Sequence, residues 1–259
     1  MKLLEGRKGL IFGIANDRSI ACHITKGFVG EGALCGFPYL PGEKSERRVQ
    51  EALEEIGVAN GWLPPCDVAK DADLDATFAA TRERFETIDF LVHSLAFADG
   101  TYLKPGKFAE TPREVFAQAL DISAYSLVAM ARRAKALMPK GGSILAMTYY
   151  GSDKAVPGYN VMGVAKAALE ACVRYLALEL GEFGIRVNAI SAGPIKTLSS
   201  MAVGGIDEIF AWVEKKTPLR RNIDADEVGK TAVYLASDLS SGVTGETIFV
   251  DAGYNIVGL

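Results

Sequence analysis

Two tyrosines and a lysine in the middle of the chain could do chemistry together. Tyr149 follows an apolar run at residues 142–148, and Tyr159 and Lys166 lie in the helical pattern after it. Their spacing is two helical turns, so the phenol of Tyr159 and the ammonium of Lys166 lie within roughly 20° of each other on one helix face. A phenol can donate a hydrogen bond to a developing negative charge, and an ammonium can hold hydroxyl groups. The elements around these residues decide which reaction they can serve.

Short apolar runs alternate with helical patterns along the whole chain. The runs predict strands at residues 9–15, 33–39, 61–66, 88–94, 142–148, 185–191 and 246–250. The patterns between them predict helices at residues 19–31, 44–56, 72–85, 112–137, 159–182 and 225–237. Strands that are apolar throughout are typical of a parallel sheet covered on both faces. The sequence therefore predicts an α/β fold, a single doubly wound Rossmann-type domain over residues 1–259 with a seven-stranded parallel sheet and helices on both faces.

The composition disfavours several classes of protein. The 259 residues are 49% hydrophobic and 23% charged, with a net charge of −4, and no basic cluster suggests a nucleic-acid binder. The N-terminus lacks the apolar stretch of a secretory signal, and no uncharged run approaches the ~20 apolar residues of a membrane span. The four cysteines are scattered, and His23 and His93 have no metal-ligating neighbours in the sequence. We therefore expect a cytoplasmic, metal-free protein that binds neither membranes nor nucleic acid.

Four segments place candidate nucleotide contacts at the carboxyl ends of the predicted strands, where ligands bind in such sheets. Gly13 begins the turn from the first strand to the next helix, and Ser19 opens that helix. The hydroxyl of Ser19 and the free backbone N–H groups of the helix can hold a pyrophosphate. Asp67 with Val68, the segment 94–96 and the segment 188–195 end three further strands. Plainer alternatives exist, a simple helix cap at Ser19 and a solvated turn at Asp67. The agreement of all four segments favours a dinucleotide site.

Taken together, Tyr159, Lys166, the run 188–194 and the closing run 250–254 resemble the short-chain dehydrogenase/reductase family over essentially the whole chain. Ordinary members carry Tyr-x3-Lys and a TGxxxGxG turn. Here position 163 is glycine, the lysine comes at 166, and the turn has one glycine followed by Ser19. Both departures, with a second tyrosine ten positions before Tyr159, resemble a divergent branch of that family, the bacterial NADH-dependent enoyl-acyl-carrier-protein reductases.

The resemblance implies reduction of the trans-2 double bond of an enoyl chain on acyl carrier protein, a step of fatty-acid elongation, by a homotetramer. It implies catalytic roles for Tyr149, Tyr159 and Lys166, with Tyr159 donating to the thioester oxygen and Lys166 holding the nicotinamide ribose. The expected cofactor contacts are Gly13, Ser19, Ile20, Leu40, Asp67, Val68, Leu95, Lys166, Ile195, Lys196, Thr197, Leu198 and Ser199. The expected substrate contacts are Ala98, Tyr149, Tyr159, Met201 and Ile206, the last two in a flap over about residues 197–216.

The interval between Tyr159 and Lys166 favours reduction of C=C over C=O. Carbonyl reduction needs a stronger proton donor at the oxygen, and in ordinary members of the family the lysine lowers the pKa of the tyrosine for that purpose. A lysine three residues further on lies about 4.5 Å further along the helix, which weakens that effect. Two alternatives stay open, a carbonyl-reducing member such as a 3-oxoacyl reductase and a non-catalytic nucleotide-sensing protein.

The sequence departs from the family's pattern at two places, one that bears on cofactor binding and one that bears on binding of the carrier protein. The second strand is followed by Leu40, where NADH-dependent relatives often carry glutamine, and no acidic residue ends it to bind a ribose 2′-hydroxyl. NADH is the expected cofactor, with NADPH as an alternative if basic residues meet a 2′-phosphate; the candidates are Lys44, Arg47 and Arg48. Residues 204–208 lack a basic patch for the acidic carrier. The positive charge must then come from Lys196, Lys215, Lys216, Arg220 or Arg221.

Overall fold

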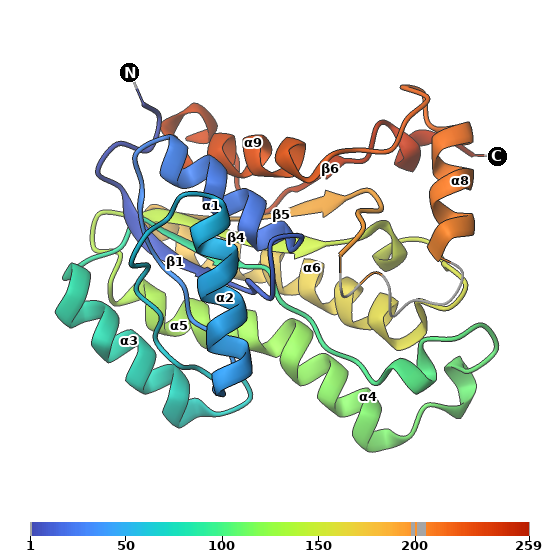
Figure 1. Ribbon diagram of the computed structural model, residues 1–259, viewed down its shortest axis with the longest axis horizontal. Coiled ribbons are helices and arrows are strands. Elements are labelled where there is room, and N and C mark those ends of the chain that lie inside the picture. Colours follow the sequence, from blue (N-terminus) through green and yellow to red (C-terminus); the bar gives the residue numbers. More distant parts are fainter. Residues whose placement is uncertain (1, 198–199, 201–205, 259) are drawn as a thin grey trace.

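A parallel sheet forms the centre of the molecule in the computed structural model, which describes all residues except 1, 198–199, 201–205 and 259. Within the described residues the sheet has six strands in the order β2-β1-β3-β4-β5-β6. They are β1 (Lys8–Phe12), β2 (Leu34–Gly36), β3 (Phe90–His93), β4 (Gly142–Thr148), β5 (Ile185–Ala192) and β6 (Thr247–Val250). The predicted α/β Rossmann-type architecture is confirmed (Figure 1).

The predicted seventh strand at residues 61–66 is wrong. This segment runs beside the end of β2 and makes two isolated parallel bridges, Gly36 with Trp62 and Tyr39 with Pro65. Pro64 and Pro65 have no backbone N–H, so they cannot donate to a continuous ladder. The apolar run therefore lies along the sheet edge without becoming a strand.

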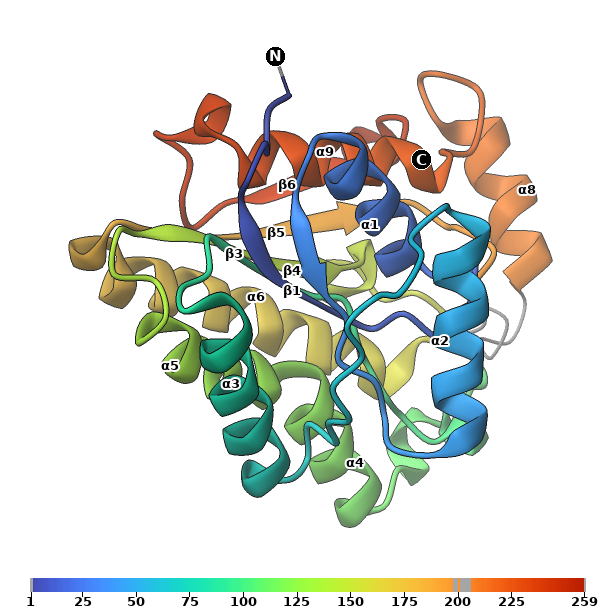
Figure 2. The same ribbon diagram turned by 60° about the vertical axis from the view of Figure 1, so that its left-hand side comes forward.

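Helices cover both faces of the sheet, as predicted. They are α1 (Ile20–Gly30), α2 (Glu43–Glu55), α3 (Asp71–Phe85), α4 (Arg113–Leu120), α5 (Ser126–Lys135), α6 (Asn160–Leu180), α8 (Ile206–Lys216) and α9 (Ala225–Ala236). Figure 1 shows α1 and α9 above the sheet and α3, α5 and α6 below it, and the turned view in Figure 2 shows α9 and α3 on opposite sides of the sheet. None of the helices in the described part of the chain is long and apolar enough to span a membrane.

Two hydrophobic cores follow from the alternation of side chains along the strands. Leu91 and Ile144 point into the core beneath α3, α5 and α6. Val92 and Leu145, their neighbours in sequence, point into the core beneath α1, α2 and α9. Because every central strand is buried on both faces, its sequence is apolar throughout rather than alternating.

The helix predicted at residues 112–137 is interrupted. A π-helical turn at Asp121–Tyr125 separates α4 from α5. The hydroxyl of Ser126 donates to the carbonyl of Ile122 at 2.6 Å, and the hydroxyl of Ser123 accepts from the N–H of Phe97 at 3.0 Å. Serine hydroxyls that bond to backbone groups disturb regular helical geometry. The turn thereby ties the loop after β3 to the helix layer.

The direction of chain travel reverses between β1 and β3, and the crevice for a ligand lies at the carboxyl ends of these strands. From β1 the chain proceeds to β2 on one side and later returns to β3 on the other. Gly13, which follows β1, has φ of +105°, and a Cβ atom there would lie 1.9 Å from the carbonyl oxygen of Ser94. Only glycine fits this position, so the two strand ends meet backbone to backbone.

Candidate active site

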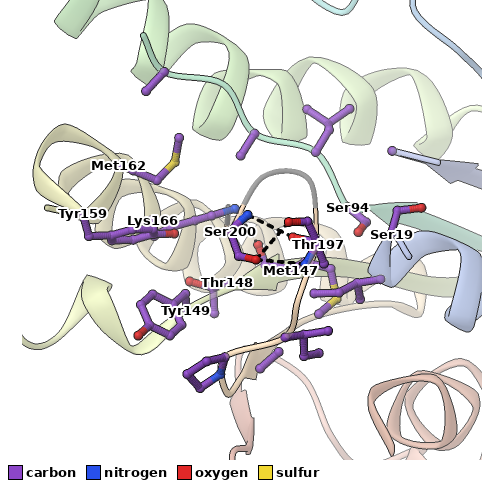
Figure 3. Close-up of a pocket in the computed structure, with 18 of the residues that line it drawn as sticks. Ser19, Ser94, Met147, Thr148, Tyr149, Tyr159, Met162, Lys166, Thr197 and Ser200 are labelled. Carbon is purple, nitrogen blue, oxygen red and sulfur yellow. Dashed lines mark hydrogen bonds between the residues drawn. The ribbon is translucent and has the colours of Figure 1, made fainter. Parts of the chain in front are cut away.

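A cavity of about 410 Å³ opens at the carboxyl ends of the central strands. Figure 3 shows Tyr149, Tyr159 and Lys166 on one side of it and Ser19 and Ser94 on the other. The structure brings the following predicted site residues together around this cavity: Gly13, Ser19, Ile20, Leu95, Ala98, Tyr149, Tyr159, Lys166, Ile195 and Thr197. Segments far apart in the sequence therefore form one site, and the role of each residue stays a prediction.

The two tyrosines pack against each other at the wall of the cavity. Tyr149 follows the last residue of β4, and Tyr159 occupies the N-cap position of α6. Their ring centroids lie 4.9 Å apart with an interplanar angle of 72°, an edge-to-face contact. The sequence pattern placed Tyr159 inside a helix from residue 159; it lies one residue before the first helical residue.

Two glycines let the turn after Tyr149 pack directly on α6. A Cβ atom at Gly151 would lie 2.4 Å from the ring of Tyr159, and one at Gly163 would lie 2.6 Å from the carbonyl oxygen of Gly151. Position 163 is the one that carries the lysine in ordinary short-chain dehydrogenases. Here no side chain fits at that position without a shift of the backbone, which gives a steric reason for the later lysine at 166.

Lys166 is buried beside the sheet and is only 6% exposed. Its Nζ donates to the carbonyl oxygen of Met147 at 2.8 Å, which fixes the ammonium at the carboxyl end of β4. Burial lowers the pKa of Lys166 to about 8, and the carboxylate of Glu170 opposes that change. At neutral pH the lysine is therefore a fixed positive charge.

The tyrosine hydroxyls stay protonated at neutral pH. Burial is the main cause that raises the pKa of Tyr159 above its usual range, with further contributions from Tyr149 and Glu170. Burial likewise raises the pKa of Tyr149 to about 12, helped by Tyr254 and Tyr150. Both phenols can therefore act as neutral hydrogen-bond donors toward the cavity.

The other end of the cavity lies at the N-terminus of α1. Ser19 occupies the N-cap position, but within the described residues its side chain caps no helical N–H. Its hydroxyl donates instead to the carbonyl of Asn16 at 2.6 Å, which closes the turn after β1. The N–H groups at positions 22 and 23 donate to the carbonyl of Ser19. Those of Ile20 and Ala21 have no hydrogen-bond partner among the described residues, and residues 20–23 include no acidic side chain. This helix end suits an anionic group.

Comparison with known proteins identifies the family. The model of a family described as enoyl-(acyl carrier protein) reductase matches residues 13–255. The chain belongs to the enoyl-acyl-carrier-protein reductase family. It is 50% identical over 258 residues to an NADH enoyl-acyl-carrier-protein reductase from Synechocystis, covering 99% of both chains. It is also 50% identical over 254 residues to an NADPH enzyme of that name from Staphylococcus aureus, covering 98% of both chains.

A solved structure matches the fold of the whole chain. The Bacillus cereus enoyl-acyl-carrier-protein reductase, crystallised with NADP⁺ and indole naphthyridinone, superposes with a TM-score of 0.96 at 49% identity and covers 100% of each chain. The predicted membership of the divergent, enoyl-reducing branch of the short-chain dehydrogenases is therefore confirmed.

Some predicted site residues of this family member do not line the described part of the cavity. Leu40, after β2, is 61% exposed, and Val68 packs against one of the two cores. Asp67 pairs with Lys70 at 3.1 Å and accepts from the N–H of Ala69 at 3.1 Å. Lys196 is exposed at the rim. Their contacts with a cofactor stay predictions.

The remaining predicted residues fall in the segment after β5. Leu198, Ser199 and Met201 lie outside the described residues, and Ile206 begins α8 without a described side chain. Thr197 and Ser200, which are described, bond to each other: the N–H of Thr197 donates to the Ser200 hydroxyl at 2.9 Å, and the N–H of Ser200 donates to the Thr197 hydroxyl at 3.0 Å.

Sequence reasoning missed several residues at the site and one ion-pair cluster. The missed lining residues include Leu103, Met147, Thr148, Val156 and Ile209. Glu170, which stands one helical turn after Lys166, was also missed, although its i,i+4 spacing from Lys166 was visible in the sequence. His23, for which no partner was visible in sequence, pairs with Asp226 at 2.7 Å, and Lys26 pairs with the other oxygen of that carboxylate at 2.8 Å.

Proposed function

We propose that this protein is an enoyl-acyl-carrier-protein reductase that reduces the trans-2 double bond of an enoyl thioester with a nicotinamide cofactor. The observation that carries the proposal is the Tyr159–Lys166 pair at the cavity, with Gly163 pressed against Gly151 where ordinary short-chain dehydrogenases carry their lysine. Relatives of this name are about half identical to the chain over nearly its full length.

The residues around the cavity fit a dinucleotide. The backbone approach of Gly13 to Ser94 leaves room for a ligand close to the strand ends, and the first turn of α1 offers N–H groups to a pyrophosphate. Ser19, Ile20, Leu95, Ile195 and Thr197 would line its path. When bound, the reduced nicotinamide supplies the hydride.

Lys166 would hold the ribose hydroxyls next to the nicotinamide. Its Nζ keeps one hydrogen bond to the carbonyl of Met147, and the other two N–H groups of the ammonium can serve a ligand in the cavity. The fixed position of the ammonium would orient the ribose relative to Tyr159. Leu198, Ser199 and Lys196 would complete this side of the cofactor site.

Tyr159 would stabilise negative charge on the substrate. When a hydride adds to the β-carbon of an enoyl thioester, charge moves to the thioester oxygen, and a proton then adds to the α-carbon. A neutral phenol aimed at that oxygen stabilises the enolate, and burial keeps the phenol of Tyr159 protonated. Tyr149, in edge-to-face contact with Tyr159, would hold its ring and line the substrate side with Ala98.

The proposed cofactor is NADH. In the first turn of α2, Glu43 and Glu46 flank Lys44, the first basic residue that could meet a 2′-phosphate. Arg47 pairs with Glu51 at 3.7 Å, so acidic neighbours offset the positive charge that such a phosphate would need. One relative is named for NADPH, so the comparison of both cofactors belongs to the test.

Acyl carrier protein is the proposed partner, and a homotetramer is the proposed assembly. The segment 197–216, with Met201 and Ile206, would cover the acyl chain as a flap. Tyr175 (76% exposed) and Leu178 (81% exposed) lie three positions apart on α6 and support contacts with other copies of the chain, since neighbouring exposed apolar side chains on one helix face favour association.

One assay separates the proposal from its alternatives. We expect oxidation of NADH, followed by its absorbance, with crotonyl thioester and none with acetoacetyl thioester, and slower oxidation when NADPH replaces NADH. Oxidation with the acetoacetyl substrate alone would instead identify a carbonyl reductase. Binding of NADH without turnover of either substrate would favour a nucleotide-sensing protein.

A further inference from the structure

The carboxylate of Glu170 ties down both ends of the turn that carries Tyr149. Its Oε1 accepts a hydrogen bond from the hydroxyl of Thr148 at 2.6 Å and another from the hydroxyl of Ser152 at 2.5 Å. Thr148 is the last residue of β4, and Ser152 ends the 3₁₀ turn Tyr150–Ser152. The two donors therefore stand on either side of Tyr149, and one oxygen on α6 holds them both.

This turn has little freedom to take another position. Gly151 lies against the ring of Tyr159, and the carbonyl of Gly151 lies against Gly163 on α6. Hydrogen bonds to a charged acceptor are stronger than those between neutral groups. Loss of either hydroxyl bond would therefore release one end of a segment whose position sets the contact between Tyr149 and Tyr159.

Glu170 also carries a charge close to Lys166. The two residues are one helical turn apart on α6, and the carboxylate favours the protonated lysine against the effect of burial. Among the described residues, the other titratable groups that face this region are the fully buried ring of His93 at the end of β3 and the phenols of Tyr149, Tyr150, Tyr159 and Tyr254. His93 is neutral at physiological pH because burial and Lys166 lower its pKa to about 3. Glu170 is thus the negative charge of this group.

We propose that Glu170 is a positioning residue with two separable effects: its hydrogen bonds fix the turn of Tyr149, and its charge sustains the ammonium of Lys166. The proposal rests on the function assigned above, because it gives these two residues a purpose in substrate and cofactor binding. Glu170 does not line the described part of the cavity, so it acts through other residues.

Two variants separate the two effects. In Glu170→Gln the amide oxygen can still accept from both hydroxyls, but the charge is lost. In Ser152→Ala the charge remains, but one end of the turn is released. Glu179→Gln is the matched control, since Glu179 is exposed on the same helix and the change in charge is the same. The thermal unfolding midpoint of each variant reports whether it folds.

The first readout is the affinity for NADH without an enoyl substrate, measured against pH by fluorescence. We expect the affinity of the wild type to fall as Lys166 loses its proton near pH 8. In Glu170→Gln this fall should move to lower pH by about half a unit or more. Ser152→Ala and Glu179→Gln should keep the wild-type midpoint. Because no enoyl substrate is present, a lower pH midpoint of NADH affinity in Glu170→Gln would support the electrostatic effect of Glu170 even if the wild type failed to reduce crotonyl thioester.

The second readout is turnover with NADH and crotonyl thioester at saturating cofactor and at a pH below 7. We expect Ser152→Ala to lower kcat by about 3- to 10-fold, since a misplaced tyrosine cannot meet the substrate. Glu170→Gln should lower kcat less than Ser152→Ala under these conditions. A wild-type pH midpoint in Glu170→Gln overturns the electrostatic effect, and a wild-type kcat in Ser152→Ala overturns the positioning effect. If the variants change only the unfolding midpoint, Glu170 is purely structural and the proposal is wrong.

Discussion

At the scale of single residues, the site depends on Lys166, a lysine whose burial costs folding free energy. The ordinary pKa of lysine, 10.5, falls to about 8 at Lys166, mainly because of burial. A difference of this size corresponds to about 3 kcal/mol of folding free energy at neutral pH. The sign follows from the protons: between about pH 8 and 10.5 the unfolded chain binds a proton that the folded chain has lost, so stability rises with pH through that window. Below pH 8 the cost of the buried charge is complete.

We therefore expect Lys166→Met to stabilise the protein without cofactor while abolishing its response to NADH. Removing the buried charge should raise the free energy of unfolding by about 3 kcal/mol at pH 7. Losing the hydrogen bond to the carbonyl of Met147 should lower it by about 1 kcal/mol, which leaves a net gain of about 2 kcal/mol. Denaturant unfolding with and without NADH measures both effects. Tyr159→Phe is the matched control and should keep the NADH-induced stabilisation while losing turnover. A Lys166→Met protein that NADH still stabilises as it does the wild type would remove this lysine from the cofactor site.

At the scale of elements, the junction between β4 and α6 sets the site. The turn after Tyr149 and the first turns of α6 meet at Gly151 and Gly163 with no space for a side chain. The spacing between Tyr159 and Lys166 therefore follows from packing. A lysine side chain does not fit at position 163, where α6 touches the turn, and it does fit three residues later at position 166.

We expect Gly163→Ala to displace the turn of Tyr149. The new methyl group would lie 2.6 Å from the carbonyl oxygen of Gly151, a backbone atom that cannot rotate away. The cost should be about 1–3 kcal/mol of stability, together with a loss of kcat. Gly181→Ala, at the other end of α6, is the control because a Cβ there meets nothing within 4 Å and its φ is −60°. That variant should be neutral or more stable; equal kcat and stability for both variants would contradict the packing account.

What could be predicted from sequence also differs between elements. The central strands were predictable because they are buried on both faces and apolar throughout, and the Tyr159–Lys166 pair was predictable because helical spacing is local. The run 61–66 has the same apolar character, but Pro64 and Pro65 cannot pair in a ladder. The bonds of Glu170 to Thr148 and Ser152 could not be predicted, since they join residues 22 and 18 positions apart whose contact depends on the packed turn.

At the scale of the whole molecule, the sheet buries an ionisable side chain, His93, which affects the pH dependence of stability and does not line the described part of the active-site cavity. His93 ends β3, is fully buried and lies between the sheet and the interrupted helix. The single proton of the Ser126 hydroxyl goes to the carbonyl of Ile122, so Nε2 of His93 donates to Ser126 at 2.7 Å. Nδ1 has no hydrogen-bond partner among the described residues. Burial, and after it the charge of Lys166, outweigh a hydrogen bond to the backbone of His93 itself and lower the pKa of His93 to about 3.

This residue makes the fold sensitive to mild acid. The unfolded chain protonates His93 below its ordinary pKa of 6.5, whereas the folded protein does not until about pH 3, so stability falls as the pH decreases through that window. Between about pH 7.5 and 5.5 the loss from His93 should be about 1.4 kcal/mol, before most carboxylates begin to take up protons. We expect His93→Gln to be less stable at pH 7.5, yet to lose about 1.4 kcal/mol less than the wild type over that interval. Chemical unfolding at a fixed protein concentration gives the difference, in which the contribution of His23 cancels because both proteins contain it. Equal losses in the two proteins would mean that the folded protein protonates His93 over this interval, and would contradict the lowered pKa that burial gives the ring.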